Sequence, residues 1–296
     1  MIVEDPDQLT ADVIAVMDRT QDPRLREIMS CLIRHLHAFV KEVRLTEDEF
    51  RTATALINEM GQLTNDTHNE TVLMAGSLGV SSLVCMINNP GSVSRRTSQS
   101  LLGPFWRMHS PRTENGGSLL RSATPGSALF MTGRIVDPNG EPVAGAEVDV
   151  WQSAPNGLYE NQDSEQADMN LRGKFTTDAD GRFWFRTIKP AGYPIPTDGV
   201  VGRLLAAQGR HPFRPAHMHA LAYKPGFKTL ISQVYLPDDE RLDSDAQFGV
   251  SRHLIGRLER HGEAHPTEQV DGPWYSLDYT FVMQPGEATL PRPPIK

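Results

Sequence analysis

Two histidines separated by one residue are the side chains of this sequence with the clearest potential for metal chemistry. His217 and His219 lie in the stretch RPAHMH, and Pro215 precedes them. Proline disfavours a helix at that point, and alternate residues of a β-strand point to the same face. Both imidazoles would then point to the same side and provide half of a typical transition-metal site. Many such pairs occur by chance, so a metal site also requires further ligands.

The remaining ligands do not follow from a common metal-binding motif. The two cysteines, Cys31 and Cys85, lie in apolar periodic segments and are expected to be buried free thiols, and no HExxH motif is present. Tyr159 and Tyr193 each follow a glycine-containing loop. Phenolates are hard anionic donors, so two of them with two imidazoles would suit Fe(III). Their positions alone favour a simpler interpretation, in which both are core or rim aromatic residues.

The elements that would position these residues are helical up to about residue 105. Apolar side chains recur there every three or four residues, which predicts an amphipathic helix. One such face consists of Leu25, Ile28, Leu32, Leu36, Phe39 and Val43. Thr46 and Glu49 have the spacing of a capping box, and Gly61 can end the helix that they begin.

A further helix is predicted over residues 70–87, ended by Asn89-Pro90-Gly91. Gly76 and Gly79 lie inside it and lower its intrinsic helix propensity. We therefore expect both glycines to have a packing or site reason.

Short strands separated by turns follow residue 105. They are predicted over residues 130–136, 146–151, 182–186 and 232–236. Helices followed by strands indicate an α+β chain. We predict an N-terminal helical linker and dimerisation domain over residues 1–105, and a mainly β-sandwich catalytic domain over residues 106–296.

The composition is that of an ordinary globular protein. The 296 residues are 39% hydrophobic and 22% charged, with a net charge of −8. This charge argues against nucleic acid as a partner, and no window approaches the roughly 20 apolar residues of a membrane helix. The acidic N-terminus lacks the apolar region of a signal peptide. The cysteine usage also agrees with a cytoplasmic protein.

Several long segments together resemble the intradiol ring-cleavage dioxygenases. They are LMAGSLGVSSLVCMINN, GRIVDPNGEPVAGAEVDVWQSAPNGLY, the run from Leu171 to His219, and ISQVYLPDDERLDSDAQFGV. The resemblance implies one Fe(III) per subunit, with Tyr159, Tyr193, His217 and His219 as ligands. It also implies catalytic roles for Arg214, Gln233 and Tyr193, the last as the tyrosinate that leaves the iron and takes a substrate proton.

The same resemblance implies the reaction and the partners. A small aromatic vicinal diol would react with O₂, and its ring would open between the hydroxylated carbons to a cis,cis-muconate- or maleylacetate-type product of aromatic catabolism. Family members dimerise through the helical domain and often hold a phospholipid at that interface. A homodimer with a bound phospholipid is therefore expected.

The pocket residues carried over from the family indicate the substrate branch. They are Leu73, Gly76, Leu101, Leu102, Gly103, Pro104, Phe105, Ile195, Pro196 and Arg214. The Gly-Pro-Phe run resembles the hydroxyquinol 1,2-dioxygenase branch more than the catechol branch. However, that branch usually has an aspartate where this chain has Gly76, which we expect to leave a small neutral space. Catechol and chloro- or alkyl-substituted diols therefore remain open as substrates.

Two other kinds of protein are compatible with parts of this sequence. A β-sandwich binding module could keep the fold without a metal. An extradiol or cupin-like Fe(II) enzyme could use the His-x-His pair with a carboxylate. Iron content and the colour of an Fe(III)–tyrosinate would separate both from the intradiol hypothesis.

Overall fold

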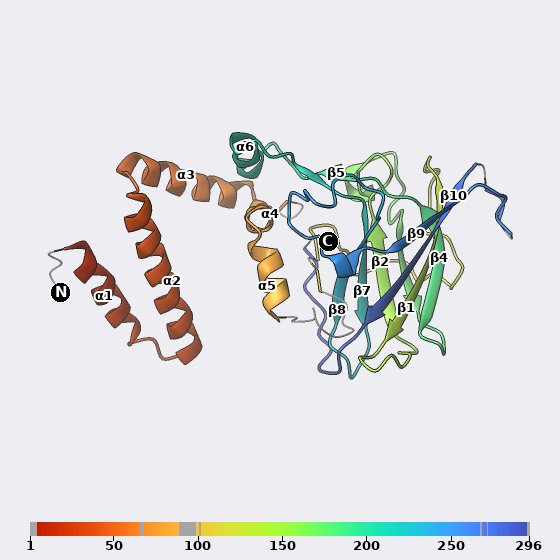
Figure 1. Ribbon diagram of the computed structural model, residues 1–296, viewed down its shortest axis with the longest axis horizontal. Helices are drawn as coiled ribbons and strands as arrows, with labels where there is room; N and C mark the ends of the chain where they lie inside the picture. The colour runs from red at the N-terminus through yellow and green to blue at the C-terminus, as the bar shows by residue number, and fades with distance from the viewer. Residues whose placement is uncertain are drawn as a thin grey trace. The chain divides into compact units, whose positions relative to one another are not determined.

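The computed structural model describes residues 5–65, 68–88, 99–100, 102–266, 268–270 and 272–294. The chain divides into two compact units, Met1–Glu59 and Met60–Lys296. Figure 1 labels their helices and strands. The helices-then-strands order confirms the predicted α+β class, whereas the domain boundary at residue 105 stays a prediction.

The first unit is helical. Its helices are α1 (Pro6–Met17), α2 (Pro23–Val43) and most of α3 (Glu47–Leu63). The predicted capping box is confirmed, because the backbone N–H of Thr46 donates to Glu49 Oε2 and that of Glu49 to Thr46 Oγ1. The predicted helix end at Gly61 is wrong, since α3 continues to Leu63. The apolar face of α2 is largely exposed.

The second unit begins with two short helices where one was predicted. Helix α4 (Glu70–Ser77) and helix α5 (Val80–Asn88) meet at a bend of 75°. Gly79 adopts φ +73° between them, a conformation that glycine tolerates and that ends a helix. The single helix over residues 70–87 is therefore wrong, and its predicted end at residues 89–91 lies outside the described residues.

No single helix in the described ranges is long and apolar enough to cross a membrane. The bent pair α4 and α5 meets that criterion only when both are counted together.

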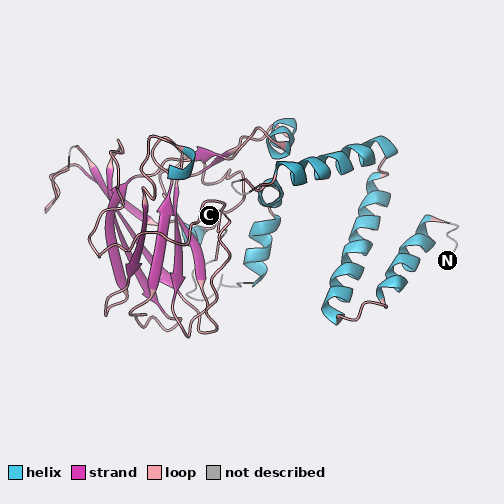
Figure 2. Cartoon of the chain, turned by 180° about the vertical axis from the view of Figure 1, so that it is seen from behind, coloured by secondary structure: helices cyan, strands magenta, loops and turns pink. Residues whose placement is uncertain are grey.

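Two four-stranded sheets make up most of the second unit. The first has the order β4–β1–β10–β9 and the second β3–β2–β7–β8. The strands of the first are β1 (Ala128–Val136), β4 (Arg182–Ile188), β9 (Arg257–His261) and β10 (Trp274–Val282). Those of the second are β2 (Glu147–Gln152), β3 (Arg172–Thr176), β7 (His217–Tyr223) and β8 (Leu230–Tyr235). Figure 2 shows these strands in magenta, and the four predicted strands correspond to β1, β2, β4 and β8.

The second unit also contains smaller elements. A two-stranded ribbon joins β5 (Tyr193–Pro194) to β6 (Phe213–Arg214), with α6 (Val200–Ala207) between them along the chain. Two short 3₁₀ turns, η1 (Glu160–Gln162) and η2 (Arg252–Leu254), complete the unit.

One apolar core lies between the two sheets. It takes Leu129 and Ile135 from β1, and Met218 and Ala220 from β7. Because side chains alternate along a strand, the other residues of β7 face away from this core. The second sheet thus has an apolar inner face and an outer face available for polar groups.

Candidate active site

The outer face of the second sheet carries both histidines. His217 and His219 are the first and third residues of β7, and both are buried. The register pairs His219 with Trp151 on β2 and with Gln233 on β8, and Trp151 stacks on the His219 ring at 4.7 Å. His217 is paired with Tyr235. The predicted strand placement of the two imidazoles is therefore confirmed.

The β5–β6 ribbon brings Tyr193 and Arg214 together as paired residues. A Cβ at Gly192 would lie 2.7 Å from the Arg214 carbonyl oxygen, so only glycine allows this approach. Tyr159 comes from the loop after β2, where Gly157 has φ +84° and a Cβ there would lie 3.0 Å from Tyr193 Cβ. The glycines before both tyrosines thus permit close packing of the two loops.

The polar atoms of the four predicted ligands converge. Tyr159 Oη lies 3.4 Å from Tyr193 Oη, which lies 3.4 Å from His217 Nε2. The two histidine Nε2 atoms are 3.2 Å apart. Elsewhere in the described residues, no three His, Cys, Asp or Glu side chains form a metal-binding group. A metal in this part of the chain would therefore depend on the tyrosines.

The hydrogen bond of His217 to the backbone sets its tautomer. His217 Nδ1 donates to the Pro215 carbonyl at 2.7 Å, which leaves the lone pair on Nε2, toward the other ligands. Burial, with a contribution from Arg214, lowers the pKa of His217 to about 3. Burial and the neighbouring His217 also lower the pKa of His219 well below its usual value. Both imidazole rings are therefore neutral, and each can offer a nitrogen lone pair to a metal ion.

Both phenols are protonated in the absence of a cation. Burial, with Tyr193, raises the pKa of Tyr159 well above its ordinary value. Burial also raises the pKa of Tyr193, although the positive charge of Arg214 acts in the opposite direction. Ionisation of either phenol therefore requires a strong positive charge nearby.

Arg214 is buried within a dense polar network. Its Nε and Nη2 each donate to one oxygen of Asp245 at 3.1 Å. Nη2 also donates to Gln233 Oε1 at 3.0 Å and to Tyr235 Oη at 2.5 Å, while Nη1 lies 3.5 Å from His217 Nε2. Burial acts to lower the pKa of Arg214, but Tyr235 and Asp245 outweigh it and raise the pKa. The guanidinium is therefore a fixed positive charge beside the ligand group.

The segment 102–106 covers the other side of this group. Gly103 has φ +76°, and a Cβ there would lie 3.0 Å from His219 Cε1. The Phe105 ring stacks on Tyr159 with centroids 4.4 Å apart, and Leu102 packs against the same aromatic cluster. Gly103 and Phe105 therefore lie beside the predicted ligands. The pocket role of residues 102–105 stays a prediction, and Leu101 lies outside the described residues.

The other predicted pocket residues form an adjacent layer. Ile195 belongs to a buried apolar cluster against which Leu73 packs, and Pro196 is half-buried. Gly76 is buried, but the expected open space beside it is absent. A Cβ at Gly76 would lie 1.7 Å from Gln247 Oε1, because the Gln247 carboxamide fills that position and donates to Ser77 Oγ at 2.8 Å.

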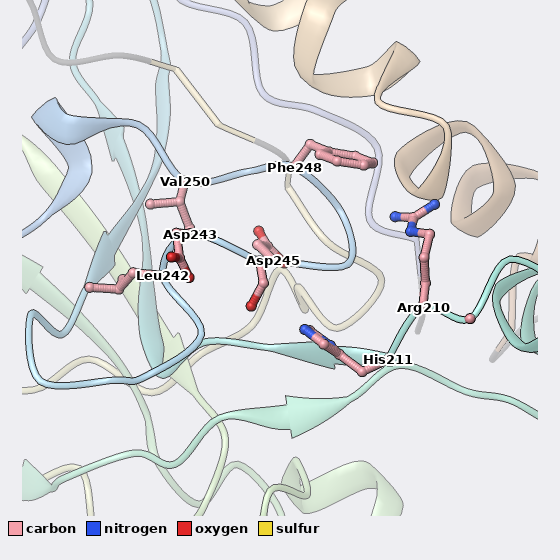
Figure 3. A pocket seen from close by; sticks show the side chains of 9 residues that line it. Arg210, His211, Leu242, Asp243, Asp245, Phe248 and Val250 are labelled. Atoms are coloured by element: carbon pink, nitrogen blue, oxygen red, sulfur yellow. The ribbon is translucent and has the colours of Figure 1, made fainter.

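A cavity of about 530 Å³ lies beside the carboxylate that holds Arg214. Figure 3 shows Asp245, Arg210 and Phe248 among the side chains around it. The Arg210 guanidinium lies over the Phe248 ring at 4.8 Å. None of the four predicted ligands lines this cavity.

Several residues of the site were not predicted from the sequence. Trp151, Tyr235 and Asp245 contact His219 or Arg214 directly. Tyr235 could have been found, because it lies two residues after Gln233 on one strand and must share its face. Asp245 lies in a loop, where no periodicity indicates its partner.

Comparison with known proteins identifies the family. The family model described as "Dioxygenase" matches residues 101–285, and "Catechol dioxygenase N terminus" matches residues 22–95. A hydroxyquinol 1,2-dioxygenase of Rhizobium sp. (strain MTP-10005) is 43% identical over 92% of each chain. A 6-chlorohydroxyquinol 1,2-dioxygenase of Cupriavidus pinatubonensis is 40% identical over 95% of this chain and 98% of that protein.

The solved structures agree with the sequence relatives. A hydroxyquinol 1,2-dioxygenase from Pseudomonas putida DLL-E4 superposes with a TM-score of 0.88 at 37% identity, over 95% of this chain and 99% of that one. A catechol 1,2-dioxygenase from Pseudomonas arvilla C-1 gives a TM-score of 0.79 at 28% identity, over 94% and 92% of the two chains. These matches extend over both the helices and the sheets that position the converging tyrosines and histidines. The chain therefore belongs to the intradiol ring-cleavage dioxygenases, a family of non-haem iron enzymes.

Proposed function

We propose that this chain inserts both atoms of O₂ into a hydroxyquinol-type vicinal diol and opens the ring between the hydroxylated carbons. The proposed cofactor is one Fe(III) per subunit, with Tyr159, Tyr193, His217 and His219 as ligands. The observation that carries this proposal is the convergence of two phenol oxygens and two imidazole nitrogens. Successive atoms in the order Tyr159, Tyr193, His217 and His219 lie 3.2–3.4 Å apart.

The donor set fits a trivalent iron in spacing and in charge. Nitrogen and oxygen donors about 2.1 Å from a common ion are about 3.4 Å apart when tetrahedrally arranged. Two phenolates and two neutral imidazoles would offset two of the three positive charges. Both phenols are buried and resist ionisation otherwise, so a strong cation explains why they face each other here.

The side chains around this group have separate roles in the proposed reaction. When bound, Fe(III) supplies activation of the chelated diol toward O₂. Tyr193 Oη accepts a proton from a substrate hydroxyl. Arg214 stabilises the negative charge that develops on the substrate. Gln233, which accepts from Arg214 and Tyr235, orients that guanidinium and can hydrogen-bond an anionic intermediate.

Hydroxyquinol is the favoured diol because the two sequence relatives named above are a hydroxyquinol and a 6-chlorohydroxyquinol 1,2-dioxygenase. Gly103, Pro104 and Phe105 would line the ring-binding side, and Leu73, Ile195 and Pro196 the adjacent layer. A catechol, with no third hydroxyl, is the alternative substrate, since Gly76 contributes no polar side chain.

The first experiment combines iron analysis with oxygen labelling. The purified protein should contain iron and show a phenolate-to-iron band in its visible spectrum, which should shift when hydroxyquinol is added without O₂. After ¹⁸O₂ is admitted, mass spectrometry should find two labelled oxygen atoms in the diacid product. A protein without iron or colour after reconstitution would overturn the proposal, and a single labelled atom would exclude intradiol cleavage.

Ligand substitutions should have the largest effect on iron binding. Tyr159→Phe and His219→Ala should each lower iron affinity by more than the roughly 10- to 100-fold typical of residues that only support a ligand. Matched controls are Tyr275→Phe on β10 and His109→Ala on the surface, which should keep wild-type iron content. Full iron retention in both ligand variants would contradict the assignment.

We further propose a cytoplasmic homodimer in which residues 1–105 link and dimerise the subunits and residues 106–296 carry catalysis. The exposed apolar side chains of α2 support this interface, and a phospholipid is the proposed occupant beside it. Light scattering of the purified protein should give twice the mass of one chain, and native mass spectrometry should release a lipid. The free cysteines Cys31 and Cys85 agree with a reducing compartment.

A further inference from the structure

A second buried arginine, Arg172, lies in the same transverse row as His219. The row crosses β3, β2, β7 and β8 as Arg172, Trp151, His219 and Gln233. The Arg172 side chain is fully buried. Removing a guanidinium from water is costly unless its contacts compensate. The partners of Arg172 should therefore indicate what this position requires.

Arg172 is bonded to both segments that flank the Tyr159 ring. Its Nε donates to Glu160 Oε1 at 2.6 Å, and Glu160 directly follows Tyr159 in the chain. Its Nη1 donates to the backbone carbonyl of Phe105 at 2.6 Å, and the Phe105 ring stacks on Tyr159. The planar guanidinium thus sets the separation between the loop that carries Tyr159 and the segment that covers His219.

Arg172 shares the Glu160 carboxylate with a second cation. Glu160 Oε1 also accepts from Arg107 Nη1 at 3.1 Å, and Arg107 donates to the exposed Asp168. Within the described residues, Arg172 Nη2 and Glu160 Oε2 have no hydrogen-bond partner. Such an incompletely paired ion pair contributes little net stability, since an apolar pair of similar volume would often serve as well. Its fixed geometry is the more informative property.

We propose that Arg172 is a positioning residue, which holds Glu160 and the Phe105 carbonyl so that the Tyr159 phenolic oxygen and the segment over His219 keep their places. This inference rests on the proposed function, because Tyr159 and His219 are iron ligands only there. Arg172 itself contacts none of the reacting groups.

The test uses two substitutions and one control in the iron-loaded protein. Arg172→Met removes both bonds, and Arg172→Lys keeps the charge but not the planar pair of donors. Arg107→Met is the control, because it removes the outer partner of Glu160 and leaves both Arg172 bonds. The readouts are the position of the phenolate-to-iron band, the rate of iron release to a chelator, and near-UV circular dichroism as a check of folding.

We expect Arg172→Met to shift the band and to speed iron release by roughly tenfold or more, with a smaller change for Arg172→Lys. Arg107→Met should leave both readouts at wild-type values. A purely structural role would lower the melting temperature without moving the band of the folded protein. A folded Arg172→Met variant with the wild-type band and the wild-type rate of iron release would therefore contradict the proposal. If Arg172→Met does not fold, the same two readouts are taken from Arg172→Lys.

The same data separate this inference from the proposed function. A wild-type protein without the band would overturn the proposed function and the role of Arg172 with it. A normal wild-type band with unchanged Arg172 variants would overturn the role of Arg172 alone.

Discussion

The two buried arginines beside the predicted ligands differ in what holds them. Arg214 donates hydrogen bonds to both oxygens of Asp245, to Gln233 and to Tyr235. Arg172 donates to Glu160 Oε1, which also accepts from Arg107, and its second hydrogen bond goes to the backbone carbonyl of Phe105. One guanidinium is thus surrounded by side chains of the site, and the other is tied to the backbone that carries the site.

This difference separates two uses of the same residue type. Arg214 approaches His217 at 3.5 Å and can offer its charge to a bound substrate. Arg172 is bonded to the segments next to Tyr159 and over His219, and in our proposal it fixes the positions of these segments. Loss of Arg214 should therefore affect turnover more than iron binding, whereas loss of Arg172 should affect the iron band first.

The largest expected effect on turnover follows from Arg214→Met. Removing a fixed positive charge that stabilises developing negative charge typically lowers kcat by roughly 10²- to 10³-fold. Iron content should change little, because Arg214 is not a ligand. The band of the substrate-free protein should change less than in the Arg172 variants, because the Arg214 side chain is bonded to other side chains and not to the backbone that carries a ligand. Steady-state O₂ uptake and iron analysis on the same sample measure both quantities.

Arg214→Lys is the matched control for charge. It keeps the positive charge but loses the bidentate contact with Asp245, so an intermediate kcat is expected. Asp245 loses its partner in Arg214→Met, which can destabilise a protein by roughly 3–5 kcal/mol, so assays should stay well below the melting temperature. Unchanged turnover in folded Arg214→Met would show that the Arg214 charge does not act on the substrate. The proposed difference in role between Arg214 and Arg172 would then be wrong.

A smaller effect is expected at Gly76, on the Arg214 side of the site. Gln247 belongs to the loop that carries Asp245, and its carboxamide lies where a side chain at position 76 would be. Gly76→Asp should therefore displace Gln247 and destabilise the protein by roughly 1–3 kcal/mol. The ratio of kcat/KM for hydroxyquinol and catechol should rise toward hydroxyquinol when Gln247→Ala is added, because the new carboxylate then has room.

The double variant Gly76→Asp/Gln247→Ala tests whether the effects of the two substitutions on stability depend on each other. Thermal unfolding should give an interaction free energy of roughly 0.5–3 kcal/mol between the two substitutions. Gly61→Ala is the control, because a Cβ there meets nothing within 4 Å and should be neutral or stabilising. Additive effects would show that Gln247 does not respond to position 76, and an unchanged specificity ratio would remove position 76 from the substrate pocket.

The parts of the molecule that could be predicted from the sequence depend on local patterns. The strand placement of His217 and His219 follows from a period of two, and the capping box of Thr46 and Glu49 from a four-residue signature. The convergence of Tyr159 and Tyr193 with the histidines did not follow from spacing and was expected only from the family resemblance.

The rest depends on contacts between distant segments. From the sequence alone, a glycine that ends a helix at position 79 could not be distinguished from one that a continuous helix tolerates. Only the positive φ of Gly79 in the structure shows that the helix ends there. Gln247 fills the space beside Gly76 from a loop that has no periodicity. The partners of Arg172 come from two other segments, and a strand pattern alone gives no reason to join them.

The last expected effect concerns stability alone, with no change in turnover, at the Arg172 end of the sheet, where Asp149 is buried on β2. Asp149 Oδ2 accepts from Trp106 Nε1 at 3.1 Å, and its Oδ1 has no hydrogen-bond partner in the described residues. Burial raises the pKa of Asp149 to about 6, against an ordinary value of 3.8. Between these values the folded chain binds more protons than the unfolded chain, so this group makes stability fall as pH rises from about 4 to 6.

The shift of about two pKa units corresponds to an order-of-magnitude loss of 3 kcal/mol at neutral pH. Asp149→Asn removes the titration and keeps an oxygen acceptor for Trp106, so the variant should melt above wild type at pH 7 and lose that advantage near pH 4. The exposed Asp180→Asn is the control and should follow wild type at both values. A variant that melts below wild type at pH 7 would mean that the ionised carboxylate is stabilised by its neighbours. A buried carboxylate at the Arg172 end would then be stabilised in its ionised form by neighbouring positive charge, as Asp245 is by Arg214.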